Sequence, residues 1–325
     1  MRRGLKVVGM LVGCLVVLAL AGLGYLFAAY PKVGAPSGVR VDATPARIAR
    51  GEYLANHVSV CTDCHSQRDS SRYAAPVKPE TLGAGGEVWD ETIGFPGRLV
   101  SRNLTPSALA GWSDGEILRA FTEGVARDGT PLFALMPYPA YGAHMAREDA
   151  LAIVAYLRTL PPRSVPIADR RLDFPLPLVV RTMPAVAHMP AAAPAPGDRK
   201  AYGEYLTRIA ACGECHTRRD QPDRYLAGGE EFPMPNGTIA RSANLTPHAT
   251  GLAGWTEAMF LERFAAYADG AGHVPVAPTA PNTPMPWGAY AGMTREDLGA
   301  IFSYLQTVPA VANRVEKFGQ RDANE

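Results

Sequence analysis

Two copies of one pentapeptide, at 61–65 and 212–216, constrain this chain more than any other feature. Both read Cys-x-x-Cys-His, the spacing that attaches a c-type haem. Cysteines three positions apart lie about one helical turn apart, so both sulfurs can reach the two vinyl groups on one edge of a porphyrin. The histidine that follows is then carried beneath the ring, where its imidazole can ligate the iron. The sequence therefore predicts two covalently bound haems c, held by Cys61, Cys64, His65, Cys212, Cys215 and His216.

Three other uses of these cysteines compete with haem attachment. A structural zinc site needs four ligands close together, usually as two pairs joined by a short loop, whereas residues 65–211 separate these two pairs. A thioredoxin-like redox pair explains Cys-x-x-Cys but not the histidine that follows it in both copies. Structural disulfides, which an exported protein can form, leave the same histidines unexplained. Haem attachment accounts for every repeated position of the motif.

The pentapeptides belong to a longer internal duplication. Such a duplication indicates the domain architecture before any single helix or strand is predicted. Each copy contains five further strings in the same order. The matched strings are Gly51–Leu54 with Gly203–Leu206, Arg68-Asp69 with Arg219-Asp220, Asn103–Pro106 with Asn244–Pro247, Gly111-Trp112 with Gly254-Trp255, and Met136–Tyr138 with Met285–Trp287. This order predicts two copies of one domain, at 40–162 and 198–325.

Both copies are predicted to be helical, so the expected fold class is all-α. The closing segments 147–161 and 295–309 carry apolar residues at helical spacing. Thr294 and Asp297 make a capping-box start for the second of these helices, and the first lacks such a cap. Helices that pack across the closing ones are expected before the motifs, over 45–59 and 199–211.

Two Pro-rich stretches interrupt this pattern. Nine of the 29 prolines lie between Pro161 and Gly197, a composition that cannot form a long helix and indicates a semi-rigid linker over 163–197. Its apolar piece, 176–180, is expected along a domain surface. The second stretch, 274–286, is longer than its counterpart before Met136 and is expected to cover one side of the second haem.

The N-terminus, residues 1–32, is a candidate transmembrane anchor. Arg2, Arg3 and Lys6 precede an uncharged run from Val7 to Tyr30, which exceeds the roughly 20 residues needed to cross a bilayer. Basic residues before such a run keep that end in the cytoplasm. A removed signal peptide and a lipid attached at Cys14 are the alternatives. All three interpretations place the haem domains on the periplasmic side of the bacterial inner membrane.

Composition argues against several other classes of function. The net charge of +1 gives no reason to expect nucleic acid or a strongly charged partner. The chain has neither a phosphate-binding glycine loop nor a Ser-His-Asp pattern, and no catalytic side chain is predicted. The redox step is therefore expected from the cofactors, while the protein sets their reduction potential and the access of other molecules to them.

The second axial ligand decides what each iron can do. A methionine thioether raises the reduction potential and suits electron transfer. Met136 and Met285 are the candidates, because each lies about 70 residues after its haem histidine and precedes a proline and an aromatic residue. Met145 and Met293 also match each other, but they stand at helix starts and are assigned to packing. The other histidines are interpreted as surface or hydrogen-bonding residues: His57, His144, His188, His248 and His273.

Four strings, at 103–106, 124–129, 136–141 and 155–162, carry a resemblance. With the haem motifs, they are similar to the membrane-bound cytochrome c subunits of bacterial alcohol and aldehyde dehydrogenases. The resemblance covers 45–162 and 198–312. It implies class I cytochrome c folds, transfer of substrate electrons, and ligation of iron by His65 with Met136 and His216 with Met285. Those subunits usually carry three haems, whereas this chain has two motifs.

Together these features predict a membrane-tethered dihaem c-type cytochrome with two tandem class I domains. It is expected to pass electrons from a periplasmic dehydrogenase or a quinone-linked donor to another cytochrome or a terminal oxidase. Its expected partners are dehydrogenase or oxidase subunits, other cytochromes and the membrane. Two alternatives stay open: the dihaem subunit of a haem-copper oxidase, and a dihaem cytochrome c peroxidase, which needs one iron with an exchangeable site.

Overall fold

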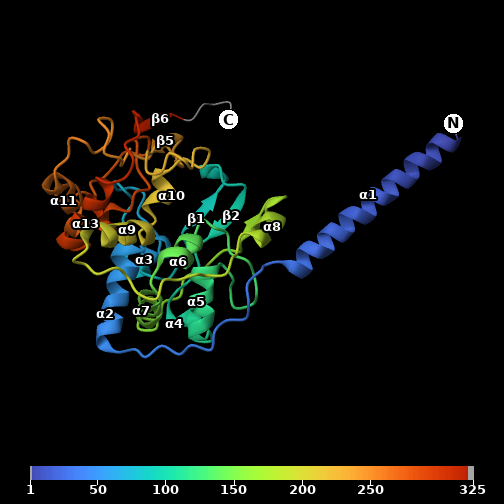
Figure 1. Cartoon of the computed structure of the whole chain (residues 1–325), viewed down its shortest axis with the longest axis horizontal. Coiled ribbons are helices and arrows are strands. Elements are labelled where there is room, and N and C mark those ends of the chain that lie inside the picture. Colours follow the sequence, from blue (N-terminus) through green and yellow to red (C-terminus); the bar gives the residue numbers. More distant parts are fainter. Residues whose placement is uncertain (1, 321–325) are drawn as a thin grey trace.

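The computed structural model describes residues 2–320 and is mostly helical, with one long helix projecting from a rounded body (Figure 1). We call residues 45–162 the first repeat and residues 198–312 the second repeat. The first repeat contains α2 (Pro45–Tyr53), the π-helical turn η1 (Leu54–Val58), α3 (Cys61–Cys64), η2 (Pro79–Thr81), β1 (Val88–Asp90), η3 (Glu91–Ile93), β2 (Gly97–Val100), α4 (Pro106–Leu109), α5 (Asp114–Glu123), α6 (Tyr138–His144) and α7 (Arg147–Leu157).

The remaining elements lie between the repeats and in the second repeat. Between the repeats are β3 (Arg171–Leu172), α8 (Leu176–Val179) and η4 (Val180–Thr182). The second repeat contains α9 (Arg199–Ile209), α10 (Cys212–His216), β4 (Glu231–Pro233), β5 (Thr238–Arg241), α11 (Glu257–Ala265), η5 (Ala268–Gly270), α12 (Trp287–Tyr290) and α13 (Arg295–Leu305), and β6 (Phe318–Gln320) follows it.

The helix before each motif packs across the helix that closes the same repeat, as predicted. α2 crosses α7, and α9 crosses α13. Each crossing is made at a glycine, because a Cβ added to Gly51 would overlap the main chain of Ala152, and one added to Gly203 would overlap that of Ala300. The two main chains of each pair therefore approach closely.

The closing helices bury the predicted side chains, but only half of the capping box predicted at Thr294 forms, because the Asp297 carboxylate accepts from the Tyr53 hydroxyl instead of the Thr294 amide. The Thr294 side chain accepts a hydrogen bond from the Asp297 amide (3.1 Å) at the start of α13, whereas α7 begins without a side-chain cap. The apolar positions of both helices are buried: Ala150, Ile153, Val154, Leu157, Leu160, Leu298, Ile301, Phe302, Leu305 and Val308. One hydrophobic core draws on both repeats.

Two small antiparallel sheets correct the prediction of an all-α fold. Their strand orders are β1-β2-β3 and β4-β5-β6. In the first sheet Trp89 pairs with Leu99, and in the second Phe232 pairs with Ala240. The third strand of each sheet comes from a segment beyond the closing helix, since β3 lies in the Pro-rich linker and β6 near the C-terminus. Strands of two to four residues are too short for alternation to be read from sequence.

The Pro-rich insertion at 274–286 contacts the first repeat. The Val274 carbonyl accepts a hydrogen bond from the Tyr73 amide (2.8 Å). The Asn282 side chain accepts from the Ala74 amide (2.7 Å) and donates to the Arg72 carbonyl (3.0 Å). The insertion is thus a link between the two repeats, a role that the sequence did not predict.

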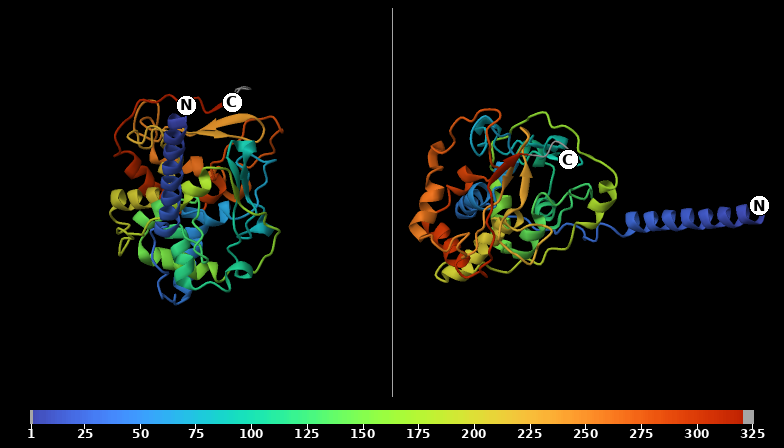
Figure 2. Two further views of the ribbon diagram at one scale, coloured as in Figure 1. Left: turned by 90° about the vertical axis from the view of Figure 1, so that its right-hand side faces the viewer. Right: turned by 90° about the horizontal axis from the view of Figure 1, so that it is seen from above.

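Helix α1 (Arg2–Ala29) extends away from the body, as Figure 1 and the right-hand view of Figure 2 show. The stretch Arg3–Ala29 is long and apolar enough to cross a membrane by length and composition, a test that a signal sequence near an N-terminus also passes. The apolar helix agrees with the predicted N-terminal segment and leaves anchor and signal peptide as alternatives.

Candidate haem sites

Each Cys-x-x-Cys-His motif forms one helical turn that begins after a left-handed residue. Val60 (φ 44°) precedes α3, and Ala211 (φ 55°) precedes α10. This conformation is costly for residues other than glycine, and it turns the chain sharply from the preceding helix into the motif. All five cysteines are free thiols, so no disulfide joins the two cysteines of either motif. Within residues 2–320, no cluster of three or more His, Cys, Asp or Glu side chains has the arrangement of a metal site.

The first cysteine of each motif is partly buried, and the second is exposed to solvent. Burial raises the pKa of the Cys61 and Cys212 thiols to about 12. Burial also raises the pKa of Cys64 to about 12, with smaller contributions from neighbouring acidic groups that include Cys215 of the other repeat. At neutral pH the thiols of both motifs are therefore protonated.

Each motif histidine is oriented by a main-chain carbonyl. The Nδ1 atom of His65 lies 2.7 Å from the Arg102 carbonyl oxygen, and that of His216 lies 2.7 Å from the Ala243 carbonyl oxygen. A carbonyl only accepts, so Nδ1 carries the proton and Nε2 keeps its lone pair. Burial lowers the pKa of both imidazoles, which favours their neutral form. A neutral imidazole held in this way is the arrangement that protein metal ligands use.

The repeated Asn-Leu-Thr-Pro string holds these carbonyls in place. Asn103 follows Arg102 directly, accepts a hydrogen bond from the Thr105 amide (2.7 Å) and donates to the Arg163 carbonyl (2.7 Å). Asn244 repeats the pattern with the Thr246 amide (2.9 Å) and the Val311 carbonyl (2.9 Å). The sequence shows the string in both repeats, and the fold shows its role. The presence of the string in both repeats was the one signal in the sequence that it has a structural role.

The two candidate methionines occupy the same local geometry. In each case the amide two residues later donates to the methionine carbonyl, from Tyr138 to Met136 (2.7 Å) and from Trp287 to Met285 (2.8 Å). The intervening prolines have φ, ψ of −77°, 45° and −80°, 62°, so each loop is an inverse γ-turn rather than an extended segment. Both methionines are half-buried.

The alternative pair of methionines lies in the core. Met145 is 0% exposed and Met293 is 6% exposed, and both belong to the hydrophobic cluster. A thioether that is enclosed by closely packed protein atoms has no room beside it for a haem. The packing role assigned to these two residues therefore agrees with the structure.

Two tyrosines tie the methionine segments to the haem motifs. The Tyr141 hydroxyl donates to the Ser59 carbonyl (2.8 Å), and the Tyr290 hydroxyl donates to the Ala210 carbonyl (2.7 Å). Each acceptor stands two residues before the first cysteine of its motif. Burial raises the pKa of both phenols well above the usual value, so both remain donors. The helix after each methionine is thereby held against its own motif.

Two of the remaining histidines bridge the repeats. His57 Nδ1 lies 2.9 Å from the Ala289 carbonyl oxygen, and His273 Nδ1 lies 2.8 Å from the Tyr73 carbonyl oxygen. Both therefore have the hydrogen-bonding role that the sequence interpretation gave them. A cavity of about 500 Å³ also spans the repeats, with Ala140 and His144 of α6 on one side and Glu214 of the second motif on the other.

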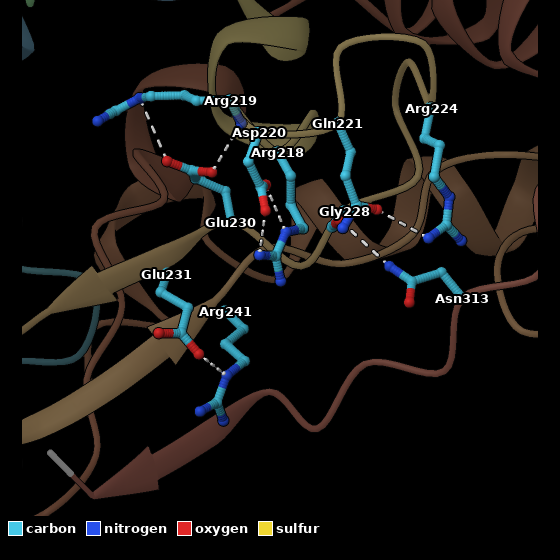
Figure 3. Close-up of polar contacts among 10 residues, drawn as sticks. All are labelled: Arg218, Arg219, Asp220, Gln221, Arg224, Gly228, Glu230, Glu231, Arg241 and Asn313. Carbon is cyan, nitrogen blue, oxygen red and sulfur yellow. Dashed lines mark hydrogen bonds and ion pairs between the residues drawn. The ribbon is translucent and has the colours of Figure 1, made fainter. Parts of the chain in front are cut away.

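The surface beside the second motif is rich in arginine, but several of these charges are neutralised. Figure 3 shows Arg218 with Asp220, Arg219 with Glu230, and Arg241 with Glu231, at N–O distances of 2.7, 3.2 and 2.7 Å. A small cavity of about 300 Å³ lies along part of this rim. Exposed ion pairs of this kind add little to stability, and they leave no concentrated positive field from these three residues.

Comparison with known proteins finds relatives along most of the chain, although no family model matches. A dihaem c-type cytochrome of Cereibacter sphaeroides is 30% identical over 269 residues, 77% of this chain and 82% of the relative. The cytochrome c subunit of the quinone-dependent alcohol dehydrogenase of Komagataeibacter europaeus is 30% identical over 299 residues, 83% of this chain. The fructose dehydrogenase cytochrome subunit of Gluconobacter japonicus is 27% identical over 305 residues, 85% of this chain. This chain spans 58% and 55% of the lengths of the last two relatives.

Proposed function

The chain belongs to the family of c-type cytochromes that includes a dihaem cytochrome and the cytochrome c subunits of quinone-dependent dehydrogenases, and from this premise we propose a two-haem electron carrier. It takes electrons from a membrane-bound dehydrogenase or a quinone-linked donor and delivers them to a downstream cytochrome or a terminal oxidase. The matched pair of histidine–carbonyl contacts, one at each motif, supports this proposal most directly.

The residues that hold the two haems form equivalent sets. Cys61 and Cys64 make the thioether links in the first repeat, with Cys212 and Cys215 in the second. His65 with Met136, and His216 with Met285, would hold the two irons. When bound, haem c supplies a reversible one-electron couple between ferric and ferrous iron. The chain orients the imidazoles through the Arg102 and Ala243 carbonyls and keeps their Nε2 atoms unprotonated.

The domain division follows the duplication. Residues 1–32 form the membrane anchor, 40–162 and 198–325 the two class I cytochrome c domains, and 163–197 the linker. The close α2–α7 and α9–α13 crossings support two equivalent domains. The anchor crosses the bacterial inner membrane with the haem domains in the periplasm, where such motifs receive haem.

Matched methionine turns favour electron transfer over peroxidase activity. A peroxidase needs one iron with an exchangeable position, whereas both repeats carry the same Met-Pro turn and the same Tyr–carbonyl tie. Carbon monoxide should therefore bind poorly to the reduced protein. Rapid, stoichiometric binding of carbon monoxide would favour the peroxidase alternative.

Purification of the full chain from native membranes tests the proposal. Mass spectrometry of the mature protein should give the polypeptide plus two haem groups, and the preparation should contain a dehydrogenase whose substrate reduces both haems. A polypeptide without covalent haem would refute the cytochrome assignment. Co-purification with a copper-containing oxidase instead would replace the dehydrogenase by an oxidase as the partner.

A further inference from the structure

The linker between the repeats exposes apolar side chains near the end of α1. Phe174 is 83% exposed, more than any other large apolar side chain outside α1 in the described residues. Val179, at the end of α8, is 42% exposed, and Val186 is 50% exposed. Several exposed apolar side chains on one short segment mark a surface that contacts a membrane or another protein.

Arg181 connects this segment to the anchor helix. Its Nη2 atom donates to the Tyr30 carbonyl (2.7 Å), with a longer contact to the Phe27 carbonyl (3.4 Å). The centre of its guanidinium lies 4.4 Å from the Phe27 ring centroid. Arg181 follows α8 after one residue, so these contacts hold α8 beside the C-terminal end of α1. Figures 1 and 2 show α8 at the edge of the body from which α1 leaves.

The end of α1 has the composition of a membrane interface. Tyr25 and Tyr30 make an edge-to-face contact (6.5 Å between centroids), and Lys32 Nζ lies 4.9 Å from the Tyr30 ring centroid. Tyrosines and a lysine at one end of an apolar helix mark the headgroup level. Arg181 reaches the carbonyl of Tyr30 and so lies at that level. The four-residue α8 rises only about 6 Å, which keeps Val179 within the same layer.

Positive charge near residues 171–186 also favours contact with anionic lipid. Lys32, Arg171 and Arg181 lie around this segment, and Arg171 is paired only loosely with the exposed Asp173, at 3.6 Å. Basic side chains beside apolar ones are attracted to anionic headgroups.

We propose that residues 171–186 form a second membrane contact, in which Phe174 and Val179 insert at the headgroup level of an anionic bilayer. This inference rests on the proposed retention of α1 as a transmembrane anchor. A lone helix would let the body rotate about a flexible connection, whereas a second contact sets one orientation. It would direct the same face of the cytochrome toward every partner in the membrane.

Spin labelling of the complete haem-loaded protein tests the contact. Because the motif cysteines are consumed as thioethers, Cys14→Ala leaves no free thiol, and Phe174→Cys or Val179→Cys then takes a single nitroxide. The labelled proteins are placed in vesicles of phosphatidylethanolamine and phosphatidylglycerol (3:1) with the haems reduced, and the collision rates with oxygen and with a nickel chelate are compared. Val274→Cys, at a 55% exposed position of the second repeat, is the matched control.

Insertion predicts a several-fold higher oxygen-to-nickel collision ratio at positions 174 and 179 than at position 274. Labels at 174 and 179 that are as accessible to nickel as the control would overturn the second contact. Flotation of the same vesicles and the mass of the mature chain report separately on the anchor. Protein that floats with intact residues 1–30 but has a water-exposed label at 174 refutes only the contact. Mature protein that lacks residues 1–30 refutes the anchor on which the inference rests.

Discussion

At the scale of single residues, the two candidate haem sites share one contact, between the motif histidine and a main-chain carbonyl. Behind His65 and His216 are main-chain carbonyls at the same distance, which fix the ring and its tautomer. Met136 and Met285, the proposed second ligands, stand in matching Met-Pro turns of the two repeats. If both ligate iron as proposed, the two haems should have similar ligand fields.

Replacing a ligating methionine should therefore change one haem at a time. Met136→Leu or Met285→Leu removes the thioether, so we expect loss of the weak methionine-to-iron absorption band of that haem. Its potential should fall by about 0.1 V or more, a fraction of the roughly 0.8 V range that axial ligands command. Optical redox titration of the single variants measures both effects.

Met145→Leu and Met293→Leu are the matched controls, because these side chains are buried in the core and a leucine conserves most of their volume. Both should keep the absorption band and the potential. Loss of the band in a control variant, with retention in Met136→Leu or Met285→Leu, would reverse the ligand assignment.

The candidate ligands could be proposed from sequence because each belongs to a short string that occurs twice, and the ligation itself stays a prediction. The carbonyls of Arg102 and Ala243 could not be identified in this way, since any residue supplies a carbonyl and only the fold brings these two to the histidines. The same holds for the acceptors of Tyr141 and Tyr290, whose side chains were visible in the repeated strings although their partners were not.

At the scale of elements, the helix crossings decide whether each repeat can close. A glycine within a helix is usually unfavourable relative to alanine by roughly 0.5–1 kcal/mol. Gly51 and Gly203 nevertheless stand at the two crossings, where a side chain would overlap the facing helix. Close packing of the main chains thus outweighs helix propensity at both positions.

Gly51→Ala and Gly203→Ala should each destabilise the protein by about 1–3 kcal/mol, because the added Cβ forces the helices apart. Helix propensity alone predicts the opposite sign, so chemical denaturation followed by circular dichroism separates the two effects. Gly254→Ala is the control, since its Cβ would meet nothing within 4 Å, and it should change stability by less than about 0.5 kcal/mol. A stabilised Gly51→Ala variant would contradict the crossing argument.

Helices were predictable at this scale and strands were not. The closing helices carry their apolar spacing over three turns, and the cap at Thr294 is a local signal. By contrast, β3 and β6 are two and three residues long, and each pairs with a strand about 75 residues earlier in the chain. Their pairing depends on where the chain returns after the closing helix, which no local pattern encodes.

At the scale of the whole molecule, the two repeats hold each other by exchanging equivalent contacts. Tyr53 of α2 donates to Asp297 of α13 (2.6 Å), and Tyr205 of α9 donates to Asp149 of α7 (2.5 Å). Burial raises the pKa of both phenols, which remain donors at neutral pH. The exchange relates the repeats by an approximate twofold arrangement and brings their motifs together.

The two contacts differ in one respect. Asp149 has an arginine partner in addition to its tyrosine, whereas in the described part of the chain Asp297 has the tyrosine alone among its side-chain hydrogen-bond donors. Arg50 donates to both oxygens of Asp149 (2.9 and 2.7 Å), whereas the second repeat has Tyr202 at the position of Arg50. Among the hydrogen bonds of residues 2–320, Tyr53 is the sole side-chain donor to the buried Asp297. Loss of one tyrosine hydroxyl therefore has different consequences at the two ends of the interface.

Tyr53→Phe should lower the free energy of unfolding by about 2–3 kcal/mol, since it leaves a buried carboxylate without its hydrogen bond. Tyr205→Phe should lower it by only about 1 kcal/mol, because Arg50 still neutralises Asp149. Chemical denaturation of the two single variants measures the difference. In an Arg50→Gln background, the loss of stability caused by Tyr205→Phe should rise toward the loss caused by Tyr53→Phe. Equal losses in the two single variants would mean that the arginine does not compensate. The interface would then behave as two identical contacts, and the asymmetry at Arg50 would have no energetic role.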